Sequence, residues 1–260
     1  MDTTMHDAVT RDTADYEIGV TTSLTDRPLR NLKDGEAFAV LDSRGDFGRR
    51  AGTAEGLFFR DTRFLSYLEL RLEGQKLELL SSTTHDDKAT LSVNLTNPDL
   101  DSGAENIARE TIFVERTKFL WKGTLYERLR VKNFASETRR LRFNYLFDAD
   151  FHDLFEVRGV GRQARGRVSA RVIGPDRVEF HYFGLDGISR RTFISFAPSP
   201  GVLETNGAQL DLDLAPGGAA SIFVTIACGE EKVGGRVGAP QNVPDFFRAY
   251  RDSRRSRRGL

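Results

Sequence analysis

Apolar and polar residues alternate with period two through most of the chain. Between Tyr67 and Leu72, leucines take every second position. Because successive side chains of a β-strand point to opposite faces of a sheet, this pattern predicts a strand with one buried face. Glu73 and Gly74 then turn the chain into another leucine-bearing run, which predicts a hairpin. Comparable runs follow at Leu91–Leu95, Ile112–Val114, Leu125–Val131, Leu141–Phe147, Val168–Val172, Val178–Tyr182, Ile194–Phe196, Leu210–Leu214 and Ile222–Ile226.

Short segments rich in Gly, Pro, Asp and Asn separate these runs at intervals of roughly 10 to 15 residues. Such even spacing, with few helical patterns, predicts an all-β fold: a large antiparallel β-sandwich, supersandwich-like, with a C-terminal linker helix. The expected division is a flexible N-terminal arm over residues 1–34, a sandwich domain over 35–233, and a linker with the start of a helix over 234–260. Within the sandwich, Glu36–Leu41 and the polar turn at Asp42–Asp46 predict one further hairpin.

The C-terminal segment has a different pattern. Glycines precede Asn242–Tyr250, which has the polar cap, early proline and acidic residue that are typical of a helix start. Arginines then continue at helical spacing from Arg251 to Arg258, without a second apolar face to pack against. We therefore expect a helix that serves as a linker.

Composition limits the classes of function. The 38 Lys and Arg residues balance 38 Asp and Glu residues, so no overall charge attracts nucleic acid or an anionic membrane, and neither is expected as a partner. No apolar run approaches the length of a membrane span, and the N-terminus lacks the apolar stretch of a signal peptide. A single cysteine, Cys228, allows no internal disulfide. The lack of a disulfide, of a membrane span and of a signal peptide together favours a cytoplasmic location.

Two polar clusters are candidates for chemistry. Asp148, Asp150, Asp153 and Glu156 form the densest acidic segment, and two carboxyl groups held on either side of a glycosidic bond are what hydrolysis requires. A calcium site, a structural turn or an interdomain contact are the other interpretations. The second cluster, Arg60–Arg63, suits an internal ion-pair network or a contact to an acidic or sugar ligand. No metal-binding or cofactor-binding motif is found in the sequence.

Aromatic residues offer a further possibility. Phe119 and Trp121 could stack on a sugar ring if they were exposed, although core packing is the simpler interpretation. The segment Gly159–Gly166 resembles a dinucleotide loop only superficially, because no βαβ pattern surrounds it. We interpret it as a turn.

Four segments together resemble the N-terminal domain of bacterial glycogen-debranching-type proteins, the amylo-α-1,6-glucosidase family. They are Phe38–Asp46, Gly56–Ser66, Leu95–Leu100 and Asp148–Gly159, and the resemblance extends from about Leu32 to Tyr250. It implies a β-rich sandwich followed, in full-length relatives, by an (α/α) toroid catalytic domain that carries the catalytic carboxylates and acts on α-glucan. No residue of this chain is therefore expected to be catalytic.

The function implied by the resemblance is that of an accessory domain. Such a domain packs on the catalytic domain and helps to shape the mouth of its glucan site. The motif residues expected at that contact are Arg60, Asp61, Arg63, Asp150, Asp153, Glu156 and Arg158. The alternative is a free-standing carbohydrate-binding or protein-interaction module whose last helix docks back on its own sheet.

Overall fold

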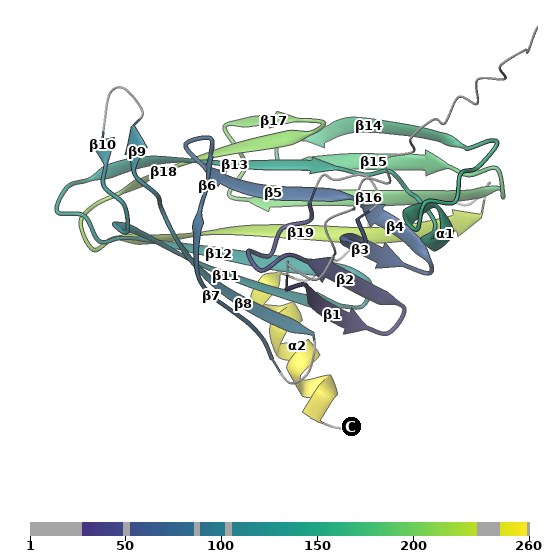
Figure 1. Ribbon diagram of the computed structural model, residues 1–260, viewed down its shortest axis with the longest axis horizontal. Helices are drawn as coiled ribbons and strands as arrows, with labels where there is room; N and C mark the ends of the chain where they lie inside the picture. Colours follow the sequence, from purple (N-terminus) through teal and green to yellow (C-terminus); the bar gives the residue numbers. More distant parts are fainter. Residues whose placement is uncertain (1–27, 49–52, 86–88, 102–105, 233–244, 259–260) are drawn as a thin grey trace, which may run out of the picture.

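The alternating runs form antiparallel strands in the computed structural model, which describes residues 28–48, 53–85, 89–101, 106–232 and 245–258. The larger sheet has eight strands, and its apolar rows face a five-stranded sheet across the core (Figure 1). In spatial order its strands are β14 (Arg167–Gly174), β15 (Arg177–Phe183), β16 (Ile188–Ala197), β19 (Ala219–Lys232), β12 (Thr124–Asn133), β11 (Ile112–Trp121), β8 (Thr90–Thr96) and β7 (Glu78–Thr84).

The opposite sheet contains the predicted hairpin at Glu73 and Gly74. Both residues adopt positive φ there, as a tight turn with right-handed strand twist requires. The strands of this sheet are, in order, β17 (Val202–Glu204), β18 (Gly207–Leu214), β13 (Arg139–Asp148), β5 (Tyr67–Leu72) and β6 (Gln75–Lys76). Buried side chains of both sheets form one continuous apolar cluster, which confirms the predicted sandwich.

A four-stranded sheet packs beside the sandwich. Its strands, in order, are β1 (Arg30–Asp34), β2 (Ala37–Leu41), β3 (Gly56–Phe59) and β4 (Thr62–Leu65), and a separate small pair consists of β9 (Leu100–Asp101) and β10 (Asn106–Ile107). The predicted hairpin after β2 is present only in part: β2 pairs antiparallel with β1, which precedes it, and with β3, which follows it. The turn at Asp42–Asp46 does not join β2 directly to β3, because it leads first to Phe47, which forms a bridge with Leu68. The first sheet strand thus lies within the segment expected to be a flexible arm. Residues 1–27 and 233–244 of the expected arm and linker lie outside the described residues.

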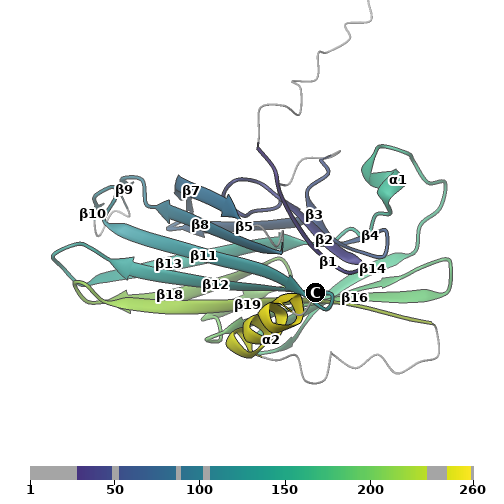
Figure 2. The ribbon, with the colours of Figure 1, turned by 90° about the horizontal axis from the view of Figure 1, so that it is seen from below.

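Two short helices complete the described structure. Helix α1 (Leu154–Val157) follows β13, and α2 (Phe246–Arg258) lies against the outer face of the eight-stranded sheet (Figure 2). The expectation that the C-terminal helix has nothing to pack against is wrong. Phe246 and Ala249 are buried against Phe119 and Tyr126, whose side chains point outward from β11 and β12. Phe119 is therefore covered and offers no exposed platform for a sugar.

Neither described helix is long and apolar enough to cross a membrane.

Candidate functional site

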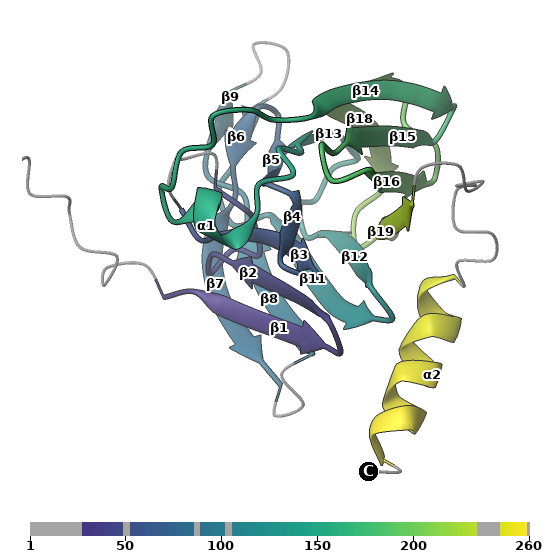
Figure 3. The same cartoon turned by 90° about the vertical axis from the view of Figure 1, so that its right-hand side faces the viewer.

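Two of the four motifs, Gly56–Ser66 and Asp148–Gly159, meet at one end of the molecule, where the β3–β4 turn lies beside α1 (Figure 3). Arg60 and Asp61 form the two-residue turn, and both have positive φ, which this turn type requires. The backbone N–H of Leu154 donates to the carbonyl of Asp61 at 3.1 Å, and the N–H of Arg63 donates to the carbonyl of His152 at 2.8 Å. These backbone bonds hold the α1 segment against the turn.

Arg63 lies inside this junction. Its side chain is 8% exposed and forms a two-pronged ion pair with Asp150, one prong of which is Nε to Oδ1 at 3.1 Å. Its Nη1 also donates to the carbonyls of Thr53 and Glu55, at 3.0 and 3.2 Å. A planar guanidinium suits such a fork because it has several donors in fixed directions. Arg63 and Asp150 thus form an internal network that joins the two motifs.

Asp153 and Glu156 organise α1 itself. The Asp153 carboxylate accepts from the N–H groups of Phe155 and Glu156, both at 2.9 Å, and the Glu156 carboxylate accepts from the N–H of Asp153 at 3.0 Å. This reciprocal arrangement is a capping box. Although burial opposes ionisation, the backbone N–H groups and Arg162 hold the pKa of Asp153 below its ordinary value. Arg165 pairs with Glu156 at 2.9 Å, which ties the following loop to the helix.

The remaining predicted residues are on the surface. Arg60 is exposed and pairs with Glu36 at 3.0 Å and with Glu230 at 3.5 Å, while Asp61 and Arg158 are also exposed. Phe155 and Val160, in and just after α1, are also exposed, with 59% and 51% of their surface accessible. We call these five side chains, Arg60, Asp61, Phe155, Arg158 and Val160, the α1 face. The sequence reasoning did not single out Phe155 and Val160. The signal that could have found them is that both are apolar residues within or next to a polar motif.

The acidic segment does not present a free carboxyl pair. Asp150 is engaged by Arg63, and its Oδ1 also accepts from the N–H of His152 at 3.2 Å. Asp148 is exposed at the end of β13 and accepts from the N–H of Ala149. An ion-paired carboxylate suits a structural role better than proton donation. Among the described residues, no group of three His, Cys, Asp or Glu side chains is placed to hold a metal ion.

A second polar cluster, which the sequence reasoning did not identify, lies between the sheets. Arg116 donates from Nε to Glu127 and from Nη1 to Asp46, both at 2.7 Å, and Lys118 Nζ lies 3.0 Å from Glu127. All four side chains are buried. The sequence contained a signal for this cluster: Arg116 and Lys118 occupy the same alternating positions as the apolar residues of the strand Ile112–Trp121, which are its inward positions.

Burial sets the ionisation of this core ion cluster (Asp46, Arg116, Lys118 and Glu127). Burial raises the pKa of Asp46 to about 6 despite the neighbouring Arg116, and it lowers the pKa of Lys118 to about 8 despite Glu127. For Glu127 burial acts in the same direction as for Asp46, but Arg116 and Lys118 together hold its pKa below the ordinary value. The cluster therefore contains two groups that titrate within about one pH unit of neutrality.

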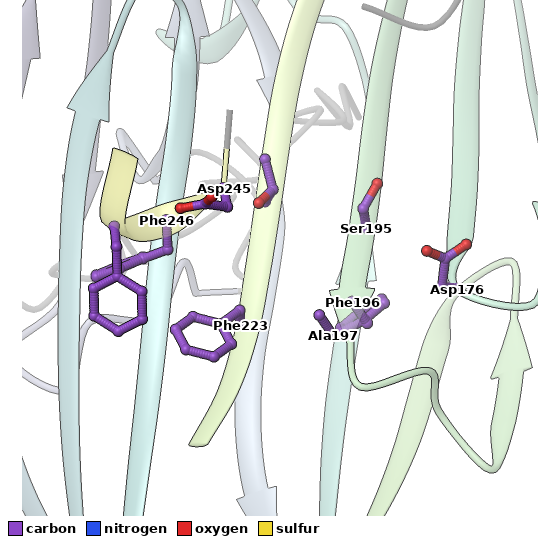
Figure 4. Close-up of a pocket in the computed structure, with 9 residues that line it drawn as sticks. Asp176, Ser195, Phe196, Ala197, Phe223, Asp245 and Phe246 are labelled. Atoms are coloured by element: carbon purple, nitrogen blue, oxygen red, sulfur yellow. The ribbon is translucent and has the colours of Figure 1, made fainter. Parts of the chain in front are cut away.

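A pocket of about 250 Å³ lies where the start of α2 meets the outer face of the large sheet (Figure 4). Phe223 and Phe246 form its wall on one side, and Asp176 and Ser195 lie on the other. Asp245 accepts from the N–H of Arg248 at 2.9 Å and so caps the helix rather than pointing a free carboxylate at a ligand. The pocket is mostly apolar.

The sequence of the chain matches one protein family. Residues 32–225 match the model that describes the N-terminal domain of some glycogen debranching enzymes. The chain belongs to the family of glycogen debranching enzyme N-terminal domains. This agrees with the resemblance carried by the four motifs, and the match includes both halves of the junction at Arg63 and Asp150. No curated protein sequence matches the chain.

Solved structures show what this debranching-enzyme domain resembles in fold. A protein from the human microbiome, named as a candidate kojibiose phosphorylase, is similar with a TM-score of 0.50 and 9% identity, over 87% of this chain and 32% of that chain. A candidate aldose 1-epimerase of Escherichia coli K12 has a TM-score of 0.43 and 10% identity, over 80% of this chain and all of the other. A galactose mutarotase-like protein from Lactobacillus casei ATCC 334 has a TM-score of 0.41 and 8% identity, over 78% of this chain and all of the other.

The identities are too low for more than a likeness of fold. The match to the phosphorylase-like chain spans about a third of that protein, so the debranching-enzyme domain corresponds in fold to one part of a longer polypeptide.

Proposed function

We propose that this chain is an accessory β-sandwich domain that packs on an α-glucan-hydrolysing catalytic domain in the cytoplasm. Two findings support the proposal: the family match, which describes an N-terminal domain of debranching enzymes, and the fold likeness to one part of a longer phosphorylase-like chain. An (α/α) toroid is the partner that the family resemblance implies. The accessory domain does no chemistry itself; it fixes the position of the surfaces that border the glucan site.

The observation that carries the proposal is the α1 face. Phe155 and Val160 are more than half exposed, yet the capping box and the Arg63–Asp150 network hold their segment rigidly in place. Large exposed apolar side chains on an ordered support, with charged residues around them, are typical of a surface that contacts another protein domain. Interfaces between domains of one chain are comparatively polar, which fits the surrounding Arg60, Asp61 and Arg158.

The roles of the seven motif residues then divide in two. Arg60, Asp61 and Arg158 are proposed as direct contacts, because their side chains are exposed. Arg63, Asp150, Asp153 and Glu156 are proposed as positioning residues, because they hold the turn and α1 in the conformation that presents the face. The shape of the glucan site depends on how the two domains are placed. Substitutions in the contact residues or in the positioning residues are therefore expected to lower activity by shifting that placement.

The test uses a full-length relative that carries both domains. A charged substitution at the position of Phe155, Phe155→Asp, should lower activity on branched glucan about tenfold or more by misplacing the domains. Phe134→Asp is the matched control, because Phe134 is also 59% exposed but lies on the β12–β13 connection. Both variants of the isolated chain should keep their melting temperature. Equal activity in the two full-length variants would contradict the proposed surface.

One observation favours the alternative of a free-standing carbohydrate-binding or protein-interaction module. Helix α2 packs back on the large sheet, as that alternative requires. The same packing, however, covers Phe119, and Trp121 is only partly exposed beneath Lys122, whose Nζ lies 5.3 Å from the ring centroid. Because this pair offers no open aromatic platform, carbohydrate binding is the less favoured function.

A further inference from the structure

Strand β14 forms one edge of the eight-stranded sheet (Figure 3). It pairs with β15 alone among the described strands. All residues from Arg167 to Ile173 are exposed, including Val168 and Val172, which the alternation pattern predicts to be inward-facing core residues. They remain exposed although β17 of the opposite sheet approaches both β14 and β15.

The two edges of the large sheet are not equivalent. At the other edge, β7 is approached by Arg30, whose Nε donates to the hydroxyl of Ser82 and whose Nη2 donates to the carbonyl of Ser82. A side chain that occupies edge carbonyls blocks further strand pairing. Strand β14 carries two arginines, which oppose pairing only in registers where they face one another, and Arg171 is paired with Glu179 of β15.

The sequence of β14 is compatible with antiparallel pairing to itself. A two-fold axis through Ala170 places Val168 opposite Val172, Ser169 opposite Arg171, and Arg167 opposite Ile173. No arginine then faces an arginine, and apolar residues meet on one face. Moving the axis one residue to Ser169 would place Arg167 opposite Arg171, and moving it to Arg171 would place that residue opposite itself. Opposite like charges destabilise a strand pair, so the register centred on Ala170 is preferred.

We propose that β14 pairs with β14 of a second copy of this chain, in the antiparallel register centred on Ala170. The pairing extends two eight-stranded sheets into one continuous sheet, with each free edge satisfying the backbone groups of the other. A two-fold arrangement of this kind closes on itself and leaves no further β14 edge for growth. Because a single strand contributes little area, the dimer is weak and forms at micromolar or higher concentrations.

Sedimentation equilibrium of the chain measures the pairing directly. The unmodified chain should show a monomer–dimer equilibrium, and Ala170→Lys should lower its association constant about tenfold or more, because two lysines then meet on the two-fold axis. Position 170 is exposed in the monomer, so this change should not unfold the chain, which a thermal melt checks. Leu80→Lys is the matched control: it places the same charge at an exposed position of the opposite edge and should leave association unchanged.

Cross-linking tests the register. Cα atoms of directly opposed residues lie about 4.5 to 5.5 Å apart in an antiparallel pair, which is within the range of a disulfide. Ala170→Cys should therefore form a covalent dimer under mild oxidation, while Ser169→Cys, which opposes Arg171 in this register, should not. A chain that stays monomeric to millimolar concentration overturns the proposal. Dimers that survive Ala170→Lys but dissociate with Leu80→Lys overturn it in favour of the β7 edge.

Discussion

At the scale of single residues, the core ion cluster couples stability to pH. The folded protein protonates Asp46 at about pH 6, whereas the ordinary pKa of this carboxyl is 3.8, so between those values the folded state holds an extra proton. Stability contributed by this group is therefore greatest below about pH 4 and is lost as the pH rises to 6. A pKa difference of about two corresponds to a loss on the order of 3 kcal/mol.

The substitution Asp46→Asn isolates this effect, because asparagine keeps an acceptor for Arg116 and does not titrate. We expect the unmodified chain to lose stability relative to Asp46→Asn between pH 4 and 7, measured as free energy of unfolding in urea. Titrating groups outside the core ion cluster are common to both proteins and cancel in the difference. Parallel pH profiles of the two proteins would show that Asp46 is ionised in the folded state throughout this range.

A second residue-scale prediction compares the two arginines of one turn. Arg63→Ala removes the partner of Asp150 inside the junction and leaves the carbonyls of Thr53 and Glu55 without their donor. Breaking a buried ion pair in this way costs about 3 to 5 kcal/mol, so the melting temperature should fall by many degrees. Arg60→Ala, three residues earlier and exposed, should change it little. Similar melting temperatures for the two variants would show that the Arg63 network contributes little to stability.

At the scale of elements, packing against the outer face of the large sheet holds helix α2 in place. Ala249 is fully buried against the aromatic cluster of Phe119 and Tyr126, and a carboxylate at this position would be placed in an apolar contact without a partner. Ala249→Asp should release the helix while the sandwich stays folded, because α2 packs outside the main core. The fluorescence of Trp121, the single tryptophan of the chain, reports the release as a red shift.

The control for this experiment is Ser256→Asp, which adds the same charge at an exposed position of α2. It should leave the fluorescence maximum and the protease sensitivity of the helix unchanged. Cooperative unfolding of the whole domain by Ala249→Asp would instead show that α2 is an integral part of the sandwich.

At the scale of the whole molecule, the arrangement predicts a domain with little activity of its own. Asp150 is ion-paired and Phe119 is covered, so the acidic segment offers no free carboxyl pair around Asp150 and the Phe119–Trp121 pair offers no open aromatic platform. The chain should hydrolyse neither α-1,6 nor α-1,4 glucosidic bonds, and calorimetric titration with a maltooligosaccharide should show no saturable heat below millimolar concentration. Turnover abolished by Asp150→Asn, or tight binding abolished by Trp121→Ala in a folded protein, would contradict this prediction.

The sequence by itself determined the strands, most of the turns and the family, because alternation and turn chemistry are local properties of neighbouring residues. It also identified the motif residues, but burial depends on what packs against a strand from elsewhere in the chain. Only the tertiary structure placed Arg63 and Asp150 in one internal network, brought α2 onto Phe119 and left the inward row of β14 exposed. Arg116 and Lys118 show the reason most clearly, because their charges suggest a solvated strand face. They are buried because Glu127, on the neighbouring strand β12, and Asp46, distant in sequence, pair with them.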